Sequence, residues 1–145
     1  MDWSNFDNQH LSIINLSFKK KYFDDNYLKE FKEKWLEIES KAQPYHLIIN
    51  TQNLGYISFR YCYELAKINN VIKNRKKIYL KKIIYIINNS YMDSFLELLY
   101  NISKPIVLTY VIQQSDYLKI KPNMNKVHDK ELEKLLDENK AKIIY

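Results

Sequence analysis

The chain has 145 residues, of which 46% are hydrophobic, and it carries a formal net charge of +6. This length is typical of one folded domain, and the 13 tyrosines exclude the low-aromatic composition of disordered chains. No apolar run approaches the roughly 20 residues that a membrane-spanning helix needs, and the single cysteine, Cys62, excludes an internal disulfide.

The start of the chain and its cysteine content bear on the compartment. Residues 1–4 lack both the basic segment and the apolar core of a signal peptide. A lone cysteine is typical of a reducing compartment. We therefore expect an intracellular, cytoplasmic protein.

The basic character of the chain comes almost entirely from lysine, because only two of the 23 basic residues are arginine. Lysine, isoleucine, asparagine and tyrosine are abundant and have AT-rich codons, a composition typical of an AT-rich genome such as that of a large DNA virus or a protist. This bias raises the net charge without any acidic partner. We therefore expect most lysines to cover a solvated surface.

The first third of the chain predicts a hairpin followed by a helix. Apolar and polar residues roughly alternate across residues 11–18, which is typical of a strand, and residues 3–6 are the expected second arm. Apolar residues then recur at helical spacing across residues 25–41. Either Asp24 or Asp25 is the expected cap of this helix.

The middle of the chain alternates between buried strands and amphipathic helices. Three apolar runs are nearly continuous, which is typical of strands covered on both faces of a parallel sheet. The expected strands are residues 46–50, 82–88 and 106–112, and the expected helices are residues 59–74 and 90–102. Ser58 is the expected N-cap of the first of these helices.

The last part of the chain is predicted to form a loop over residues 113–126, an amphipathic helix over residues 128–140 and a tail over residues 141–145. The complete order of elements predicts an α/β fold. We expect a single domain over residues 1–145, with an open, mostly parallel sheet of four or five strands, helices packed on it and an antiparallel hairpin at one edge.

The sequence contains no convincing catalytic motif. The only glycine, Gly55, cannot supply the several close backbone approaches that dinucleotide and phosphate-binding loops require. The histidines, His10, His46 and His128, are too scattered for a zinc site, and Cys62 is expected on an inner helix face as a small hydrophobic residue. We therefore expect no cofactor, no metal ion and no enzymatic activity.

Three polar, amide-rich segments follow the predicted buried strands. They are residues 50–55, 88–90 and 113–116. Because ligand sites in open α/β sheets lie at the carboxyl ends of the strands, any site is expected where these segments meet.

Residues 47–50 form a buried strand pattern, residues 53–57 a short loop, and residues 58–61 the sequence Ser-Phe-Arg-Tyr. This pattern resembles the STAS domain, the fold of bacterial anti-sigma-factor antagonists and of the cytoplasmic tails of sulfate transporters. Ser58 takes the place of the aspartate in the family's Asp-Ser-Ser-Gly motif, and Phe59 and Arg60 fill the two serine positions. The resemblance therefore implies the fold of the family, without a direct counterpart of its phosphoacceptor serine.

The resemblance implies a non-enzymatic interaction module that binds a protein partner, with a homodimer as an open alternative. The expected contact surface is the loop after the first buried strand and the helix that follows it. Its candidate residues are Asn53, Tyr56, Ser58, Arg60, Tyr61 and Tyr63, and aromatic and arginine side chains are the types enriched in binding hot spots.

Two other functions are left open by the sequence. One is a carrier of a lipid or other apolar ligand, as in the related CRAL-TRIO fold, which requires a cavity between the sheet and the helices over residues 24–41 and 90–102. The other is a basic surface that binds nucleic acid or an anionic membrane. Its residues are Lys73, Arg75, Lys76 and Lys77, with Lys81 and Lys82, and it requires that they share one face with residues 19–21.

Overall fold

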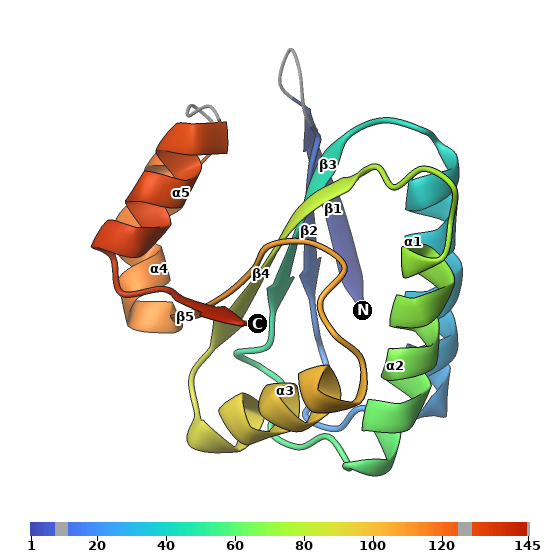
Figure 1. The fold of residues 1–145 in the computed structure, drawn as a ribbon. Helices are drawn as coiled ribbons and strands as arrows, with labels where there is room; N and C mark the ends of the chain where they lie inside the picture. Colours follow the sequence, from blue (N-terminus) through green and yellow to red (C-terminus); the bar gives the residue numbers. More distant parts are fainter. Residues whose placement is uncertain (8–11, 125–128, 145) are drawn as a thin grey trace.

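The computed structural model describes residues 1–7, 12–124 and 129–144, which fold into a six-stranded sheet with helices on both faces (Figure 1). The elements are, in chain order, β1 (Asp2–Asp7), β2 (Ser12–Ser17), α1 (Asp25–Ser40), β3 (Tyr45–Asn50), α2 (Arg60–Lys73), β4 (Leu80–Ile87), α3 (Ser90–Ile102), β5 (Thr109–Gln113), α4 (Gln114–Ile120), the 3₁₀ helix η1 (Lys121–Asn123), α5 (Asp129–Glu138) and β6 (Lys142–Ile144). The predicted α/β class is confirmed, but the sheet is larger than the four or five strands expected.

The strands lie in the sheet in the same order as in the sequence. The four strands β2 to β5 are parallel, and the two edge strands, β1 and β6, are antiparallel to their neighbours. The predicted N-terminal hairpin is therefore confirmed. Because each right-handed crossover advances in the same direction along the sheet, the helices α1, α2 and α3 all lie on one face, which we call the first face (Figure 1).

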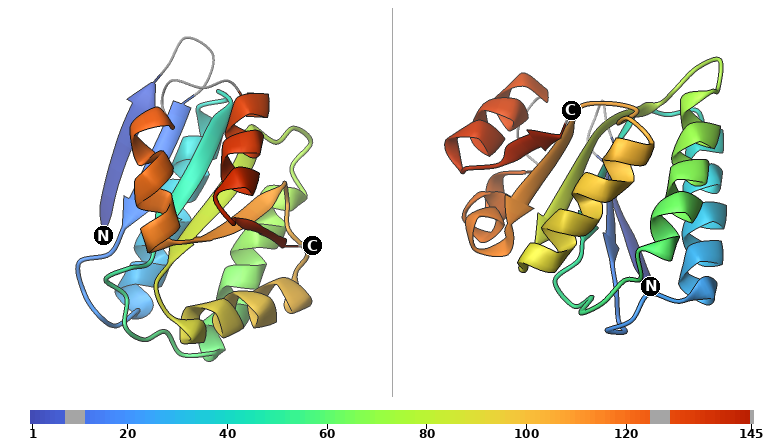
Figure 2. Two further views of the ribbon diagram at one scale, coloured as in Figure 1. Left: turned by 90° about the vertical axis from the view of Figure 1, so that its left-hand side faces the viewer. Right: turned by 60° about the horizontal axis from the view of Figure 1, so that its bottom comes forward.

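The helices α4 and α5 lie on the opposite, second face of the sheet (Figure 2). Alternate residues of each strand point to opposite faces. On β3, Leu47 and Ile49 therefore join the core under α1, α2 and α3, while Ile48 joins the core under α4 and α5. Coverage of both faces explains why the central strands read as continuous apolar runs.

Side chains cap the helices α1 and α3, and the cap of α1 is Asp24, one of the two residues expected. The carboxylate of Asp24 accepts a hydrogen bond from the backbone N–H of Tyr27 at 2.9 Å. The side chain of Asn89 accepts one from the backbone N–H of Met92 at 2.8 Å. Each side chain satisfies an amide that has no partner inside its helix.

The prediction that Ser58 caps α2 is wrong. The N-cap position is held by Phe59, which makes no side-chain capping hydrogen bond. The backbone of Phe59 is already helical, with φ −60° and ψ −21°, so Ser58 lies one residue outside the capping position. Its hydroxyl only accepts a long, exposed hydrogen bond of 3.4 Å from the backbone N–H of Arg60.

We expect Ser58→Ala to lower the free energy of unfolding by less than about 0.5 kcal/mol, because a long hydrogen bond at an exposed position contributes little. Asp24→Ala is the matched control and should lower it by about 1 kcal/mol. Urea denaturation of both variants measures the difference. A loss at Ser58 equal to the loss at Asp24 would show that the Ser58 hydroxyl does cap the helix.

The predicted loop over residues 113–126 is wrong where the structure describes it. Gln114–Ile120 is the helix α4, and η1 follows it directly. Tyr117, Ile120 and Met124 are buried against the second face of the sheet. They are spaced as one face of a helix, but the polar residues between them are typical of a loop.

The end of the chain adds an unexpected strand. The predicted tail contains β6, whose residues Ile143 and Ile144 pair with Tyr110 and Thr109 of β5. In addition, β5 begins at Thr109, three residues later than the strand expected from residue 106. The predicted start of the last helix at His128, the predicted strand residue Leu11 and the chain end Tyr145 lie outside the described residues.

A buried hydrogen-bond network joins the end of α1 to the amino ends of β3 and β4. Glu39 is buried, and its carboxylate accepts hydrogen bonds from the Tyr45 hydroxyl at 2.5 Å and from the backbone N–H of Tyr79 at 2.7 Å. The indole N–H of Trp35 donates to the Tyr45 hydroxyl at 2.9 Å. The network fixes the position of α1 against two strands of the sheet.

Candidate functional site

A cluster of exposed aromatic side chains lies at the carboxyl edge of the sheet. In Figure 1 this is the lower edge, where the strand arrow of β3 points. We call this cluster the docking surface and define it as Tyr22, Tyr56, Phe59, Tyr63 and Tyr91. The exposed fractions of the first four are 67%, 49%, 43% and 62%, and Tyr91 is half-buried. They come from the segments that follow β2 and β3 and from the helices α2 and α3, so only the fold brings them together.

Four aromatic rings of the docking surface, those of Tyr22, Tyr56, Phe59 and Tyr91, form a chain of contacts. Tyr56 stacks on Tyr91 with ring centroids 5.6 Å apart, and Tyr22 meets Tyr56 edge-on at 6.4 Å. The ring of Phe59 lies 5.4 Å from that of Tyr91. Tyr63 stands one helical turn beyond Phe59 on the same side of α2.

Backbone hydrogen bonds hold the two loops of the docking surface against each other. The carbonyl of Lys21 accepts from the N–H groups of Gly55 and Tyr56 at 2.8 and 2.9 Å. The carbonyl of Tyr56 accepts from the N–H of Phe23 at 3.2 Å. The Tyr91 hydroxyl donates to the carbonyl of Ile57 at 2.5 Å. These bonds order the two loops in the chain alone.

A polar contact anchors the start of α2 beside the docking surface. The Asp25 carboxylate accepts hydrogen bonds from the Tyr61 hydroxyl at 2.8 Å and from the Arg60 guanidinium at 3.1 Å. The Arg60 guanidinium also lies over the Tyr61 ring at 4.4 Å. Burial, and then the hydrogen bond to Asp25, raises the pKa of the Tyr61 hydroxyl, so Tyr61 stays a neutral donor to Asp25.

The structure brings together only some of the predicted contact residues. Tyr56, Arg60, Tyr63 and Asn53 are exposed, whereas Tyr61 is buried and cannot contact a partner directly. The predicted contact residues did not include Tyr22, Phe59 and Tyr91. Phe59 lay inside the expected contact loop but was interpreted only as a substitute for a serine. The predicted meeting of residues 50–55 and 88–90 brought the segment of Tyr91 close to the loop after β3, but nothing in the sequence signals that the segment of Tyr22 meets it.

The three amide-rich segments meet at the carboxyl edge of the sheet, as predicted. The side-chain amide of Asn88 donates to the backbone carbonyl of Gln52 at 3.0 Å. The side chain of Gln114 donates to that of Gln52. These contacts tie the loops after β3, β4 and β5 together.

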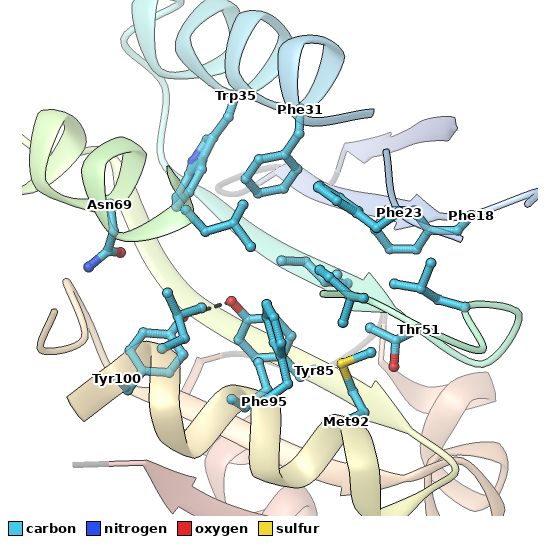
Figure 3. Close-up of a pocket in the computed structure, with 16 residues that line it drawn as sticks. Phe18, Phe23, Phe31, Trp35, Thr51, Asn69, Tyr85, Met92, Phe95 and Tyr100 are labelled. Atoms are coloured by element: carbon cyan, nitrogen blue, oxygen red, sulfur yellow. Dashed lines mark hydrogen bonds between the residues drawn. The ribbon is translucent and has the colours of Figure 1, made fainter. Parts of the chain in front are cut away.

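A cavity of about 50 Å³ lies between the sheet and the helices α1, α2 and α3 (Figure 3). Its lining is mostly aromatic and apolar, and the Tyr85 and Tyr100 hydroxyls are hydrogen-bonded to each other there at 2.7 Å. Sites for small organic ligands occupy roughly 300–1,000 Å³. The carrier alternative required a cavity at this position, and the one present is far smaller than a lipid.

The basic residues do not form one continuous surface. Lys73, Arg75, Lys76 and Lys77 are exposed at the end of α2, just before β4 begins at the amino edge of the sheet. Residues 19–21 follow β2 and therefore lie at the carboxyl edge, so the condition set for a nucleic-acid or membrane surface is not met. Lys82, which was placed in this patch, is buried and lies 3.1 Å from the Glu133 carboxylate.

Comparisons with protein-family models, with curated proteins and with solved structures found no match to this chain. Among the residues described, no helix combines the length and apolar character needed to cross a membrane. Within the same ranges, no three His, Cys, Asp or Glu side chains come close enough to hold a metal ion. The fold and the site thus define an α/β protein with a preordered aromatic surface.

Proposed function

We propose that this chain is a STAS-like, non-enzymatic interaction module whose docking surface binds a protein partner. The observation that supports this most is the contact of exposed aromatic rings in one ordered cluster. Scattered exposed apolar residues need no explanation, but contiguous ones mark interaction sites. Tyrosine also combines a large contact area with a hydroxyl that can bond to a partner.

The STAS-like part of the proposal rests on two observations. The residues from 47 to 66 resemble the family's strand, loop and helix, and the chain has a hairpin followed by three strand–helix units in the expected order. The start of α2, where the family has its serine motif, lies beside the docking surface. A phenylalanine at this point replaces a switchable hydroxyl with a constant apolar contact.

The electrostatic balance of the chain favours a different protein over a second copy. Two copies, each with a formal charge of +6, repel one another. At the docking surface, Asp24 and Asp25 are already engaged by Lys20 and Arg60, at 3.7 and 3.1 Å, while Lys21 is exposed. We therefore propose a partner that presents apolar side chains flanked by acidic residues.

The double variant Tyr56→Ser/Phe59→Ser should bind the partner at least about tenfold more weakly, because it removes two central aromatic contacts. The partner is first captured from cells of the source organism with the unaltered chain, and affinities are then measured by calorimetry with both proteins purified. Leu118→Ser is the matched control, because Leu118 is 57% exposed on α4 and lies outside the docking surface.

A melting temperature for each variant guards against misfolding, since Phe59 also packs on Phe95 with ring centroids 6.1 Å apart. Unaltered affinity in the folded double variant would refute the docking surface. Capture of the chain itself as the partner, with a dimeric mass in solution, would refute the argument from charge.

A further inference from the structure

A groove of about 300 Å³ lies between the second face of the sheet and the segment formed by α4 and η1. Figure 2 shows α4 crossing this side of the sheet. The floor consists of cross-strand neighbours in two rows of the sheet: Ser17, Asn50 and Ile86 in one row, and Ser4, Asn15 and Ile48 in the next. The groove is separate from the docking surface, with which it shares no residue.

The floor of the groove is polar on one side and apolar on the other. The hydroxyls and amides come from β1, β2 and the end of β3, whereas Ile48 and Ile86 come from the covered part of the sheet. Tyr117 and Met124 add an aromatic and an apolar wall. This division matches a ligand that has carbon–hydrogen groups on one side and hydroxyl groups on the other.

Among the described residues that line the groove, one carries a positive charge and one a negative charge. The Asp2 carboxylate is paired with the Lys19 ammonium at 3.1 Å. Lys121 is exposed at the groove wall, and no ion pair joins it to any other described residue. Within the described residues, the groove therefore presents neutral hydrogen-bonding groups together with one ammonium group, that of Lys121, that forms no ion pair.

The position of the groove is that of a ligand site in an open α/β sheet. It lies at the carboxyl ends of the parallel strands, because Ser17 and Asn50 are the last residues of β2 and β3. The chain leaves β4 toward α3 on the first face and leaves β5 toward α4 on the second face. The change of side falls between β4 and β5, and the groove lies next to it, over β1 to β4. What the groove shares with ligand sites of open α/β sheets is its place at the carboxyl ends of the strands.

We propose that this groove binds a small hydroxylated molecule with one anionic group, such as a hexose that bears a phosphate or a carboxylate. The volume lies at the lower limit of roughly 300 Å³ for small-molecule sites. The Asn15 amide can donate to and accept from hydroxyl groups. The Asn50 side-chain oxygen already accepts from the backbone N–H of Gln52 at 3.0 Å, so Asn50 offers mainly its NH₂ group as a donor. The ammonium of Lys121 forms a charge-assisted hydrogen bond with the anion.

Calorimetry on the full chain tests the proposal with four probes: glucose phosphorylated at its primary hydroxyl, glucuronate, glucose and inorganic phosphate. At least one of the two anionic sugars should bind at least about tenfold more tightly than both glucose and inorganic phosphate. Backbone amide NMR shifts should change at Asn15, Asn50 and Lys121. Equal binding of inorganic phosphate would reduce the groove to a simple anion site and overturn the proposal, as would no binding of either anionic sugar.

Two variants locate the binding. Lys121→Gln should weaken binding of the anionic sugar roughly tenfold, and Asn15→Leu should weaken it while keeping a side chain of similar size. Lys119→Gln is the matched control, because Lys119 is exposed on the same helix and lies 3.4 Å from the Asp116 carboxylate. Both exposed lysines can be changed without disturbing a core. Equal losses for Lys119→Gln and Lys121→Gln would show that general charge, and not the groove, attracts the ligand.

Discussion

Ile84→Asp should leave the protein unfolded at room temperature. Ile84 lies on the central strand β4 and is fully buried between the sheet and the helices of the second face. An unpaired carboxylate at this position costs several kcal/mol, which is comparable with the roughly 5–15 kcal/mol that stabilise a whole domain. Circular dichroism should show loss of the cooperative melting transition.

The control for this variant is Lys81→Asp on the same strand. Lys81 is exposed, and it is the extra residue where the pairing of β3 and β4 shifts register. The Lys81→Asp substitution introduces the same carboxylate at an exposed position, so the melting transition should persist. A transition at the unaltered temperature in Ile84→Asp would show that the position is not in the core.

Glu39→Ala should lower the free energy of unfolding by about 3 kcal/mol. The substitution removes a buried carboxylate and leaves the Tyr45 hydroxyl and the backbone N–H of Tyr79 without their acceptor. Each buried donor that loses its partner costs about 1–3 kcal/mol. Urea denaturation measures the loss, and the transition should remain cooperative.

Glu37→Ala is the matched control, two residues earlier on α1. Glu37 is exposed, and its carboxylate lies 3.6 Å from the ammonium of the half-buried Lys34. Such pairs contribute roughly 0–1 kcal/mol, so the loss should be small. If Glu39→Ala and Glu37→Ala lose the same amount, the buried network does not stabilise the fold.

The parts of the fold that the sequence predicts well are those with strong periodicity. The strands β3 and β4 read as buried because both of their faces are apolar, and the helices α1, α2 and α3 read as helices because one face of each is apolar. The contact of Gln52, Asn88 and Gln114 could also be predicted from the sequence, because parallel strands end at the same edge of a sheet.

The remaining parts depend on contacts between distant segments. The helix α4 has only two buried residues, Tyr117 and Ile120, in seven positions, so its polar residues dominate the local pattern. The short strand β6 is stabilised by β5, which lies about thirty residues earlier in the chain, as the pairing of Tyr110 with Ile143 shows.

Only part of the docking surface could be predicted from the sequence, because the rest depends on contacts between distant segments. Tyr56 and Tyr63 lie in the loop and helix that the resemblance singled out. Tyr22 joins them through its backbone pairing with Tyr56, and Tyr91 joins through the packing of α3 beside α2. Tyr61 and Tyr63 are only two residues apart on α2, so they lie on different sides of the helix. Tyr61 points into the core, and Tyr63 points into solvent.

Site-specific photo-crosslinking tests the docking surface most directly. A photoreactive phenylalanine analogue is placed at Tyr63 on the docking surface and, in a second variant, at Leu118 on α4; these positions have similar exposed fractions of 62% and 57%. Illumination in cells of the source organism should join one defined partner protein to position 63 and not to position 118, and Tyr56→Ser/Phe59→Ser should abolish that product. Equal products at both positions, or a product at position 63 that survives the double substitution, would contradict the docking surface.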